Sequence, residues 1–107
     1  MEKNYSDCPL EYALEILGGK WKLKILWTIY TFKVIRFNRL KREVPGITDL
    51  MLAKILKLLV ENNIVRRTQF NEIPPRVEYS LTENGLQLVE SLSNIRQWVA
   101  EQSQPAT

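Results

Sequence analysis

The sequence predicts a mainly α-helical fold with one small β-hairpin, an α+β arrangement. Apolar residues recur with a helical period before residue 64 and after residue 82, and with a period of two in between. Pairs of glycine or proline separate the segments: Gly18-Gly19, Pro45-Gly46 and Pro74-Pro75. A chain of 107 residues has the size of one domain. We therefore predict a single domain over residues 1–107, in the order helix, helix, short strand, helix, helix, strand, strand, helix.

The composition excludes several classes of function. Hydrophobic residues make up 45% and charged residues 25% of the chain, which is typical of a globular protein, and no apolar run approaches the roughly 20 residues of a membrane span. One cysteine, Cys8, cannot form an intrachain disulfide, so we expect a cytoplasmic protein. Without histidine, a Cys-His nucleophile or a His-containing metal site is impossible, and the acidic residues are scattered. We expect neither an enzyme nor a cofactor.

Charge is segregated along the chain. Residues 19–76 contain thirteen basic and four acidic residues, a net charge of +9, whereas residues 1–18 and 77–107 each carry a net charge of −3. A solvated surface ordinarily mixes the two signs. The basic middle therefore suits a polyanion such as nucleic acid, and the acidic ends suit a different role.

The first two predicted helices differ in their surfaces. The helix over residues 8–19 begins at Cys8-Pro9 and has an apolar stripe that includes Leu10, Leu14 and Leu17. The next helix, from Lys20 to about Phe32, is apolar almost all round apart from a thin strip that includes Thr28. We expect this second helix to be central and buried.

Two further helices follow a possible edge strand at residues 34–37. Asn38 can cap a brief helix that ends near Val44. From Gly46 to Val65 one amphipathic helix is expected, with Thr48 as its N-cap, Asn62-Asn63 at its end, and these residues inward: Leu52, Ile55, Leu56 and Leu59. Two helices joined by about three residues that include glycine match the helix-turn-helix pattern.

The period-two segment completes the pattern. Ile64–Phe70 and Val77–Leu81 alternate as two strands around a loop that contains Pro74-Pro75. A hairpin directly after the second helix of a helix-turn-helix is a wing, so we predict a winged helix-turn-helix whose DNA-binding core spans residues 20–82. Thr82 caps the last helix, residues 83–101, in which Gly85 is a mild weakness.

Both terminal helices carry apolar stripes that need a cover, either the protein's own core or a second subunit. Because both acidic ends carry such helices, we favour a homodimer formed by residues 8–19 and 83–101. Its interface residues are Leu10, Leu14, Leu17, Leu88, Leu92, Ile95, Trp98 and Val99.

Three stretches carry a family resemblance: CPLEYALEILGGKW, RFNRLKREVPGIT and PPRVEYSLTENG. In order and spacing they resemble the signatures of the HxlR-type transcriptional regulators, winged-helix proteins related in architecture to the MarR group, over about Cys8 to Trp98. The resemblance implies a homodimer on pseudo-palindromic DNA near promoters, with Thr48 to Asn62 in a major groove and the wing along the backbone or minor groove. We expect a repressor.

The expected DNA contacts fall into two groups. Base reading falls to the outward positions of the fourth helix: Thr48, Asp49, Leu50, Ala53, Lys54 and Lys57. Phosphate contacts fall to basic residues around it: Arg36, Arg39, Lys41, Arg42, Arg66, Arg67 and Arg76. The position of Leu50 is usually basic in HxlR-type proteins, so here the chain departs from the family. Asp49 suits DNA only if it accepts from cytosine or serves the helix N-terminus.

Several alternatives stay open. The resemblance implies that the cysteine matching Cys8 senses electrophiles or oxidants; a helix N-terminus favours its thiolate, whereas Asp7 opposes it, and an inert thiol is the alternative. An effector pocket lined by Trp21, Trp27 and Tyr30 competes with simple core packing. Because Leu50 leaves an apolar spot on the reading face, the rival function is a winged-helix module that binds protein without specific DNA binding.

Overall fold

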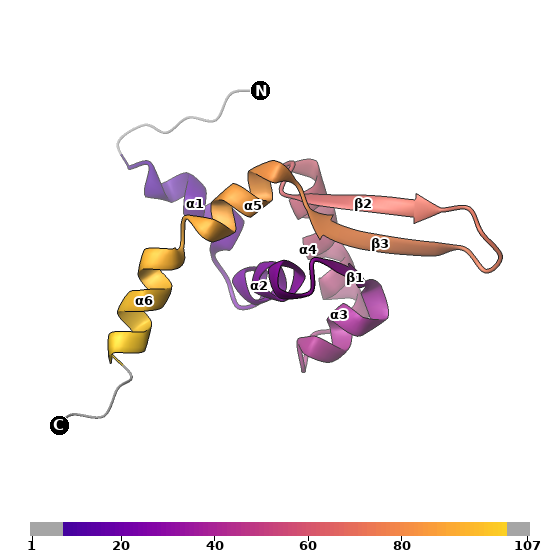
Figure 1. Ribbon diagram of the computed structural model, residues 1–107, viewed down its shortest axis with the longest axis horizontal. Coiled ribbons are helices and arrows are strands. Elements are labelled where there is room, and N and C mark those ends of the chain that lie inside the picture. Colours follow the sequence, from indigo (N-terminus) through magenta and orange to yellow (C-terminus); the bar gives the residue numbers. More distant parts are fainter. Residues whose placement is uncertain (1–7, 103–107) are drawn as a thin grey trace.

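The computed structural model describes residues 8–102, which form six helices and three strands (Figure 1). In chain order these are α1 (Leu10–Leu17), α2 (Lys22–Phe32), β1 (Val34–Arg36), α3 (Phe37–Glu43), α4 (Asp49–Glu61), β2 (Val65–Phe70), β3 (Arg76–Leu81), α5 (Glu83–Glu90) and α6 (Ser93–Gln102). The strands form one antiparallel sheet in the order β1-β3-β2. The predicted mainly helical winged fold is confirmed. Within residues 8–102, no helix is long and apolar enough to cross a membrane.

Helix α2 is the centre of the core and contacts α1, α3, α5, β1 and β3. Ile25, Leu26 and Ile29 are completely buried. The helix is central as predicted, but its burial is incomplete, because Leu23 and Trp27 are 46% and 40% exposed. Thr28, which the sequence placed in the polar strip of this helix, is buried. Its hydroxyl donates to the Lys24 carbonyl over 2.8 Å, and this hydrogen bond offsets the cost of burying a polar group.

The short strand β1 extends the wing hairpin to three strands by pairing Ile35 with Tyr79. The strand therefore lies at the sheet edge, as the sequence predicted. The predicted cap at Asn38 was wrong: α3 begins at Phe37, and the N-cap residue is Arg36, whose side chain makes no capping bond. The extended backbone of Arg36, still paired in the sheet, leads directly into the helix.

Helix α4 has the expected inward face and the expected ends. Leu52, Ile55, Leu56 and Leu59 are all buried. The Thr48 hydroxyl accepts a hydrogen bond from the Met51 amide over 3.1 Å, as an N-cap does. Within the stretch Gly46–Val65, the helix runs between the predicted cap at Thr48 and the predicted end at Asn62-Asn63, and the sheet begins at Val65.

The last helix of the prediction is two helices, which corrects the continuous helix over 83–101. Helix α5 ends at Glu90 and α6 starts at Ser93. The Ser91 hydroxyl donates to the Leu88 carbonyl over 2.6 Å, and serine side chains that bond their own backbone compete with helix continuation. Figure 1 shows α6 turning away from α5 toward the C-terminus, and none of its residues is buried.

The end of α4 is tied to the start of α5 by a compact set of hydrogen bonds. The Thr82 hydroxyl accepts from the Gly85 amide over 2.9 Å and donates to the Asn63 carbonyl over 2.7 Å. The Thr82 amide donates to the Ile64 carbonyl over 3.0 Å, and the Asn84 side chain reaches the Asn63 carbonyl over 3.2 Å. We call this set the α4–α5 junction.

Gly85 is therefore a requirement and not the weakness that helix propensity indicated. A Cβ at this position would lie 2.1 Å from the carbonyl oxygen of Ile64, which is backbone and cannot rotate away. Any side chain there must push α5 away from the sheet.

We predict that Gly85→Ala destabilises the protein by about 1–3 kcal/mol, the usual range for overpacking a buried position. The sign is informative, because an exposed helical glycine replaced by alanine stabilises by about 0.4–1 kcal/mol. Urea unfolding followed by circular dichroism measures the difference. Gln87→Ala, an exposed change in the same helix, is the control and should stay within about 0.5 kcal/mol of the parent. A Gly85→Ala variant as stable as the parent contradicts the steric argument.

Candidate DNA-binding surface

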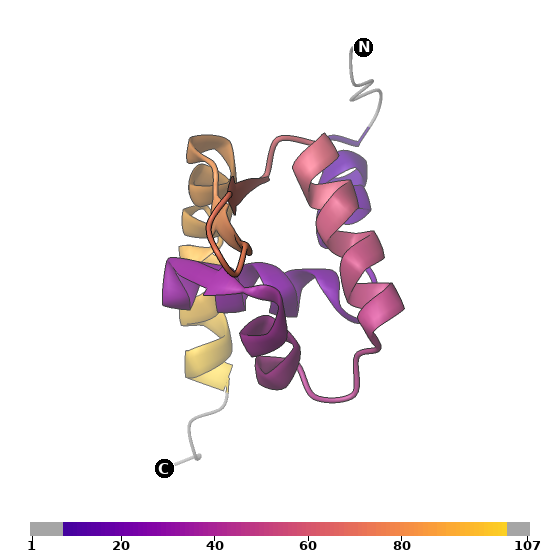
Figure 2. The same ribbon diagram turned by 90° about the vertical axis from the view of Figure 1, so that its right-hand side faces the viewer.

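The β2–β3 wing and the terminal helices α1 and α6 lie at opposite ends of the molecule. In Figure 1 the β2–β3 hairpin projects to the right, while α1 and α6 lie on the left. Figure 2, which looks from the hairpin end, shows α4 on one side of the hairpin and α5 with α6 on the other. The exposed surface of α4 therefore lies beside the wing and away from the C-terminal helix.

The exposed side of α4 carries all six side chains that the sequence assigned to base reading. Thr48, Asp49, Leu50, Ala53, Lys54 and Lys57 are each exposed, and Leu50 is 81% exposed. Within the part of the chain that the structure describes, neither lysine has a carboxylate partner. This face therefore presents the unpaired ammonium groups of Lys54 and Lys57 together with the exposed apolar side chain of Leu50.

Asp49 has a partner that sequence reasoning did not foresee. Its carboxylate lies 2.7 Å from the Lys41 ammonium, so the first turn of α4 is tied to α3. The pair removes one positive and one negative charge from the surface on which both residues were expected to meet DNA. Both side chains are largely exposed, so the pair contributes only about 0–1 kcal/mol to stability.

The arginines of α3 and β1 are not equivalent. Arg39 donates to the Glu43 carboxylate over 2.9 Å, and its guanidinium lies 4.7 Å from the centre of the Phe32 ring. Arg36 and Arg42 are exposed and have no ion pair among residues 8–102. They face a hollow of about 360 Å³ between α3 and the start of β3. Arg36 and Arg42 are therefore the available cations here, and Arg39 is already compensated.

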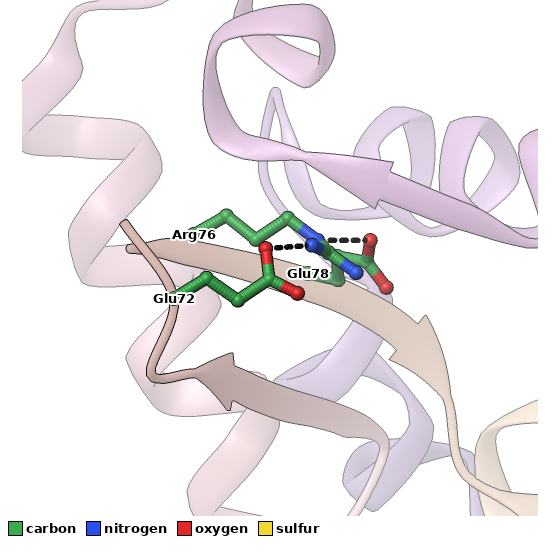
Figure 3. Close-up of polar contacts among 3 residues, drawn as sticks. All are labelled: Glu72, Arg76 and Glu78. Atoms are coloured by element: carbon green, nitrogen blue, oxygen red, sulfur yellow. Dashed lines mark hydrogen bonds and ion pairs between the residues drawn. The ribbon is translucent and has the colours of Figure 1, made fainter. Parts of the chain in front are cut away.

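Arg76 is enclosed by the wing itself (Figure 3). Its Nε donates to the Glu78 carboxylate over 3.0 Å, a second nitrogen is paired with Glu72, and the guanidinium lies 4.1 Å from the centre of the Phe70 ring. The hydrogen bond to Glu78, and to a smaller extent the one to Glu72, raises the pKa of Arg76 above its ordinary value. The arginine is fully charged but compensated. A phosphate contact, as expected from sequence, requires it to leave these carboxylates.

Arg66 and Arg67 point to opposite faces of the sheet. They pair with Ser80 and Tyr79 on β3, and successive residues of a strand alternate between faces. Arg67 lies on the face of the buried Tyr79 and lines a hollow of about 260 Å³ between the hairpin and α4. Only Arg67 of this pair therefore lies next to α4. Strand alternation alone could have separated the two.

The expected interface residues are divided between exposed and half-buried positions. Five are exposed by 50% or more: Leu10, Leu14, Ile95, Trp98 and Val99. The other three, Leu17, Leu88 and Leu92, are half-buried. Leu17 and Leu92 line an apolar groove of about 450 Å³ to which Leu23, Trp27 and Arg96 also contribute. Sequence reasoning did not place these three at the interface; for Leu23 and Trp27 the signal was that α2 is apolar on more sides than one core can cover.

The expected effector pocket does not form as one cavity. Trp21, Trp27 and Tyr30 line three separate hollows, although the Trp27 and Tyr30 rings lie 5.3 Å apart. Cys8 is exposed just before α1. Asp7, which was expected to oppose its thiolate, lies outside the described residues.

Comparison with known proteins settles the family. The sequence profile of the HxlR-like helix-turn-helix family matches residues 16–107, most of the chain. This chain belongs to the HxlR-like helix-turn-helix family. It is 44% identical to a regulatory protein, MalR, of Fusobacterium mortiferum. The alignment spans 99 residues and covers 92% of this chain and 93% of the relative. The HTH-type transcriptional regulator YtcD of Bacillus subtilis is 39% identical over 94% of this chain and 79% of its own length.

Solved structures of similar proteins agree. A MarR-family transcriptional regulator from Enterococcus faecalis V583 superimposes with a TM-score of 0.83 at 34% identity, over 97% of this chain and 93% of that one. The redox regulator HypR in its oxidised form superimposes with a TM-score of 0.79 at 36% identity, over 92% of this chain and 100% of that one. The reduced form of YodB from B. subtilis superimposes with a TM-score of 0.79 at 31% identity, over 92% of this chain and 96% of that one. This HxlR-like protein is a DNA-binding transcriptional regulator and not an enzyme.

Proposed function

We propose that this regulator is a homodimeric repressor that binds a pseudo-palindromic operator sequence-specifically through α4. The supporting observation is the exposed face of α4, which presents Lys54 and Lys57 without carboxylate partners next to further uncompensated cations. A helix of 13 residues is long enough to lie in a major groove with its first turns against the bases.

Base reading on this face combines two kinds of contact. Lys54 and Lys57 reach guanine acceptors or phosphates, whereas Leu50 and Ala53 offer only apolar contact, for instance to a thymine methyl group. Thr48 and Asp49 stand at the start of the helix, where Asp49 can accept from cytosine once it leaves Lys41. An operator with thymine opposite Leu50 fits this arrangement.

The proposed phosphate contacts differ in whether an existing ion pair must be broken before the side chain can bind DNA. Arg36, Arg42 and Arg67 have no carboxylate partner in the described chain and act as the principal backbone contacts, and Arg66 serves the opposite face of the wing. Arg39, Lys41 and Arg76 exchange a carboxylate for a phosphate if they bind, so their net contribution is smaller. Arg76 chiefly braces the wing tip.

The dimer we propose is formed by α1 and α6. The exposed leucines of α1 and the exposed Ile95, Trp98 and Val99 of α6 form an apolar surface that a second copy can cover. Two-fold symmetry then places the two α4 helices against half-sites about one helical turn, or a multiple of it, apart. Occupation of an operator that overlaps a promoter represses transcription.

We further propose that Cys8 is a redox or electrophile sensor. Two similar proteins support this: one is described as a redox regulator in its oxidised form, and the other has been treated with diamide. Cys8 is exposed beside α1, the helix assigned to the dimer. Its thiolate adds to an electrophile, or diamide takes two electrons from two thiols and leaves a Cys8–Cys8 or mixed disulfide. Either product at α1 changes the angle between subunits and therefore the distance between the two α4 helices.

One observation favours a second function, a module that binds an acidic protein. Leu50 is a large apolar side chain at 81% exposure in the middle of a cationic face, and central apolar anchors surrounded by polar residues are typical of protein interfaces. DNA binding and protein binding differ in their response to salt, which the first experiment below measures.

The first prediction concerns the charges of α4. Binding of the protein to a duplex from its upstream region weakens steeply with salt. Lys54→Gln flattens the slope of log K against log salt by about one, and Asp49→Asn, which frees Lys41, steepens it by up to about one. Fluorescence anisotropy of labelled duplex between 50 and 200 mM salt, roughly the range in which phosphate contacts differ most, measures both slopes. Duplex binding that is absent or insensitive to salt favours the protein-binding module instead.

The second prediction concerns the dimer. Leu14→Glu places a charge in the proposed interface but not in the core, since Leu14 is 65% exposed in the protomer. Losing about 1.5–3 kcal/mol of apolar burial from each subunit should convert the dimer into protomers of 12.6 kDa at micromolar concentration. Sedimentation equilibrium measures the mass. Leu50→Glu, the same change at an exposed leucine of α4, should leave the dimer intact. A parent protein that is already monomeric excludes the α1–α6 interface.

The third prediction concerns Cys8. Diamide or a quinone should lower the affinity of the parent protein for duplex by about tenfold or more, the scale of an allosteric coupling of 1–3 kcal/mol. Cys8→Ser should bind like the untreated parent and ignore both reagents, and mass spectrometry should locate the adduct on Cys8. Equal affinities before and after modification, with the adduct present, would show that Cys8 is inert.

A further inference from the structure

The wing tip carries the most exposed large apolar side chain of residues 8–102. Ile73 lies in the loop between β2 and β3 at 101% exposure, and every residue from 71 to 75 is exposed as well. Pro74 and Pro75 follow Ile73, and a proline ring fixes the backbone angle φ, so this loop has few alternative conformations. Because the loop is already restricted, a partner that covers Ile73 loses little free energy in ordering it.

The charges of the wing tip do not favour contact with a phosphate group. Between residues 70 and 78, one basic and two acidic residues give a net charge of −1. Arg76, the basic residue of this segment, is paired with both Glu72 and Glu78 (Figure 3). A phosphate is itself anionic, so this segment gains little from the DNA backbone. The apolar surface of Ile73 is the contact that the tip can offer.

The root of the hairpin has the opposite character. Arg67 on β2 and Lys57 on α4 line the same hollow, and neither has an ion pair within residues 8–102. A duplex that lies against α4, as proposed above, therefore meets these cations with its phosphates at the root of the hairpin. The tip lies farther along the duplex than this backbone contact.

The hairpin is long enough to pass the phosphate backbone. Strands β2 and β3 each have six residues, which at about 3.3 Å per residue span about 20 Å. Figure 1 shows the hairpin extending well beyond the helices. The centres of the major and minor grooves lie half a helical turn apart, about 17 Å along the duplex. With α4 in a major groove and Arg67 at the backbone, the tip therefore reaches the adjacent minor groove.

We propose that Ile73 enters this minor groove and selects against guanine there. The inference rests on the proposed function, since α4 must bind the duplex first. Both kinds of base pair present acceptors on the floor of the minor groove, and a G·C pair adds the 2-amino donor of guanine. An isoleucine that covers this amino group removes its water and supplies no acceptor, which weakens binding. Isoleucine is among the apolar side chains with which minor-groove proteins contact base steps.

The test compares three versions of one duplex. The duplex is the stretch upstream of the protein's own gene that the parent protein protects, and its outermost protected base pairs are made A·T, G·C or I·C in turn. Inosine pairs with cytosine but lacks the 2-amino group, so an I·C pair differs from G·C in the minor groove and presents the same major-groove edge. We expect the parent protein to bind the A·T and I·C versions alike and the G·C version about fivefold or more weakly, the scale of one unfavourable base pair.

Two threonine variants form a matched pair. Ile73→Thr shortens the apolar side chain and adds a hydroxyl that accepts from guanine, so it should weaken binding to the A·T version about two- to fivefold and remove most of the preference against G·C. Its slope of log K against log salt should equal that of the parent protein, because no phosphate contact is lost. Val34→Thr makes the same kind of change at an exposed residue of β1 and should bind all three duplexes like the parent protein. Ile73→Lys should instead steepen the slope by about one.

Two results would overturn the inference. One is a preference against G·C that Ile73→Thr retains in full, which would assign the effect to the shape of the duplex. The other is equal binding of the G·C and I·C versions by the parent protein, because no contact then reaches the 2-amino group. Either result leaves the proposed function in place. A parent protein that binds no duplex would overturn the proposed function itself.

Discussion

The position of α4 depends on two backbone carbonyl groups, those of Asn63 and Ile64. They lie between the end of α4 and the start of β2. They accept hydrogen bonds from the hydroxyl and the amide of Thr82 and from the side chain of Asn84. Asn63 itself has a left-handed backbone with φ of 60°, which asparagine tolerates. These bonds fix the hairpin root, the end of α4 and the start of α5 relative to one another, and Gly85 allows the close approach.

This junction is the link between two surfaces with different tasks. Helix α4 and the wing extend from one side of it, and α5 with α6 extends from the other. In the dimer proposed above, α5 and the junction are the covalent and hydrogen-bonded connection between the α6 interface and α4. Ile64, Thr82 and Gly85 are buried, whereas Asn63 and Asn84 are exposed, so the junction joins the core to the surface.

Much of the fold follows from the sequence because its signals are local. The inward face of α4, its threonine cap and the alternation of the two long strands each depend on residues a few positions apart. The role of Gly85 could not be predicted in this way, since it depends on the carbonyl of Ile64, which only the folded chain brings near. The break at Ser91 was also missed, because the apolar period continues through it.

The candidate site shows the same division. Exposure of the six outward residues of α4 followed from helical periodicity. Which cations are compensated did not, because the pairing of Lys41 with Asp49 joins two helices across a turn. Arg76 is intermediate: Glu72 and Glu78 stand four residues before it and two after it, and strand alternation places Arg76 and Glu78 on one face. That signal was present in the sequence.

The exposure of Leu50 has a consequence for how such a regulator can evolve. Thr48 caps α4 and the α4–α5 junction holds its end, so the fold asks almost nothing of the side chain at position 50, which is 81% exposed. Replacements of exposed residues of this kind usually alter stability by less than about 0.5 kcal/mol. A descendant of this chain can therefore exchange leucine for a basic or polar residue without loss of the fold, and, with α4 reading DNA as proposed, this exchange changes the target sequence.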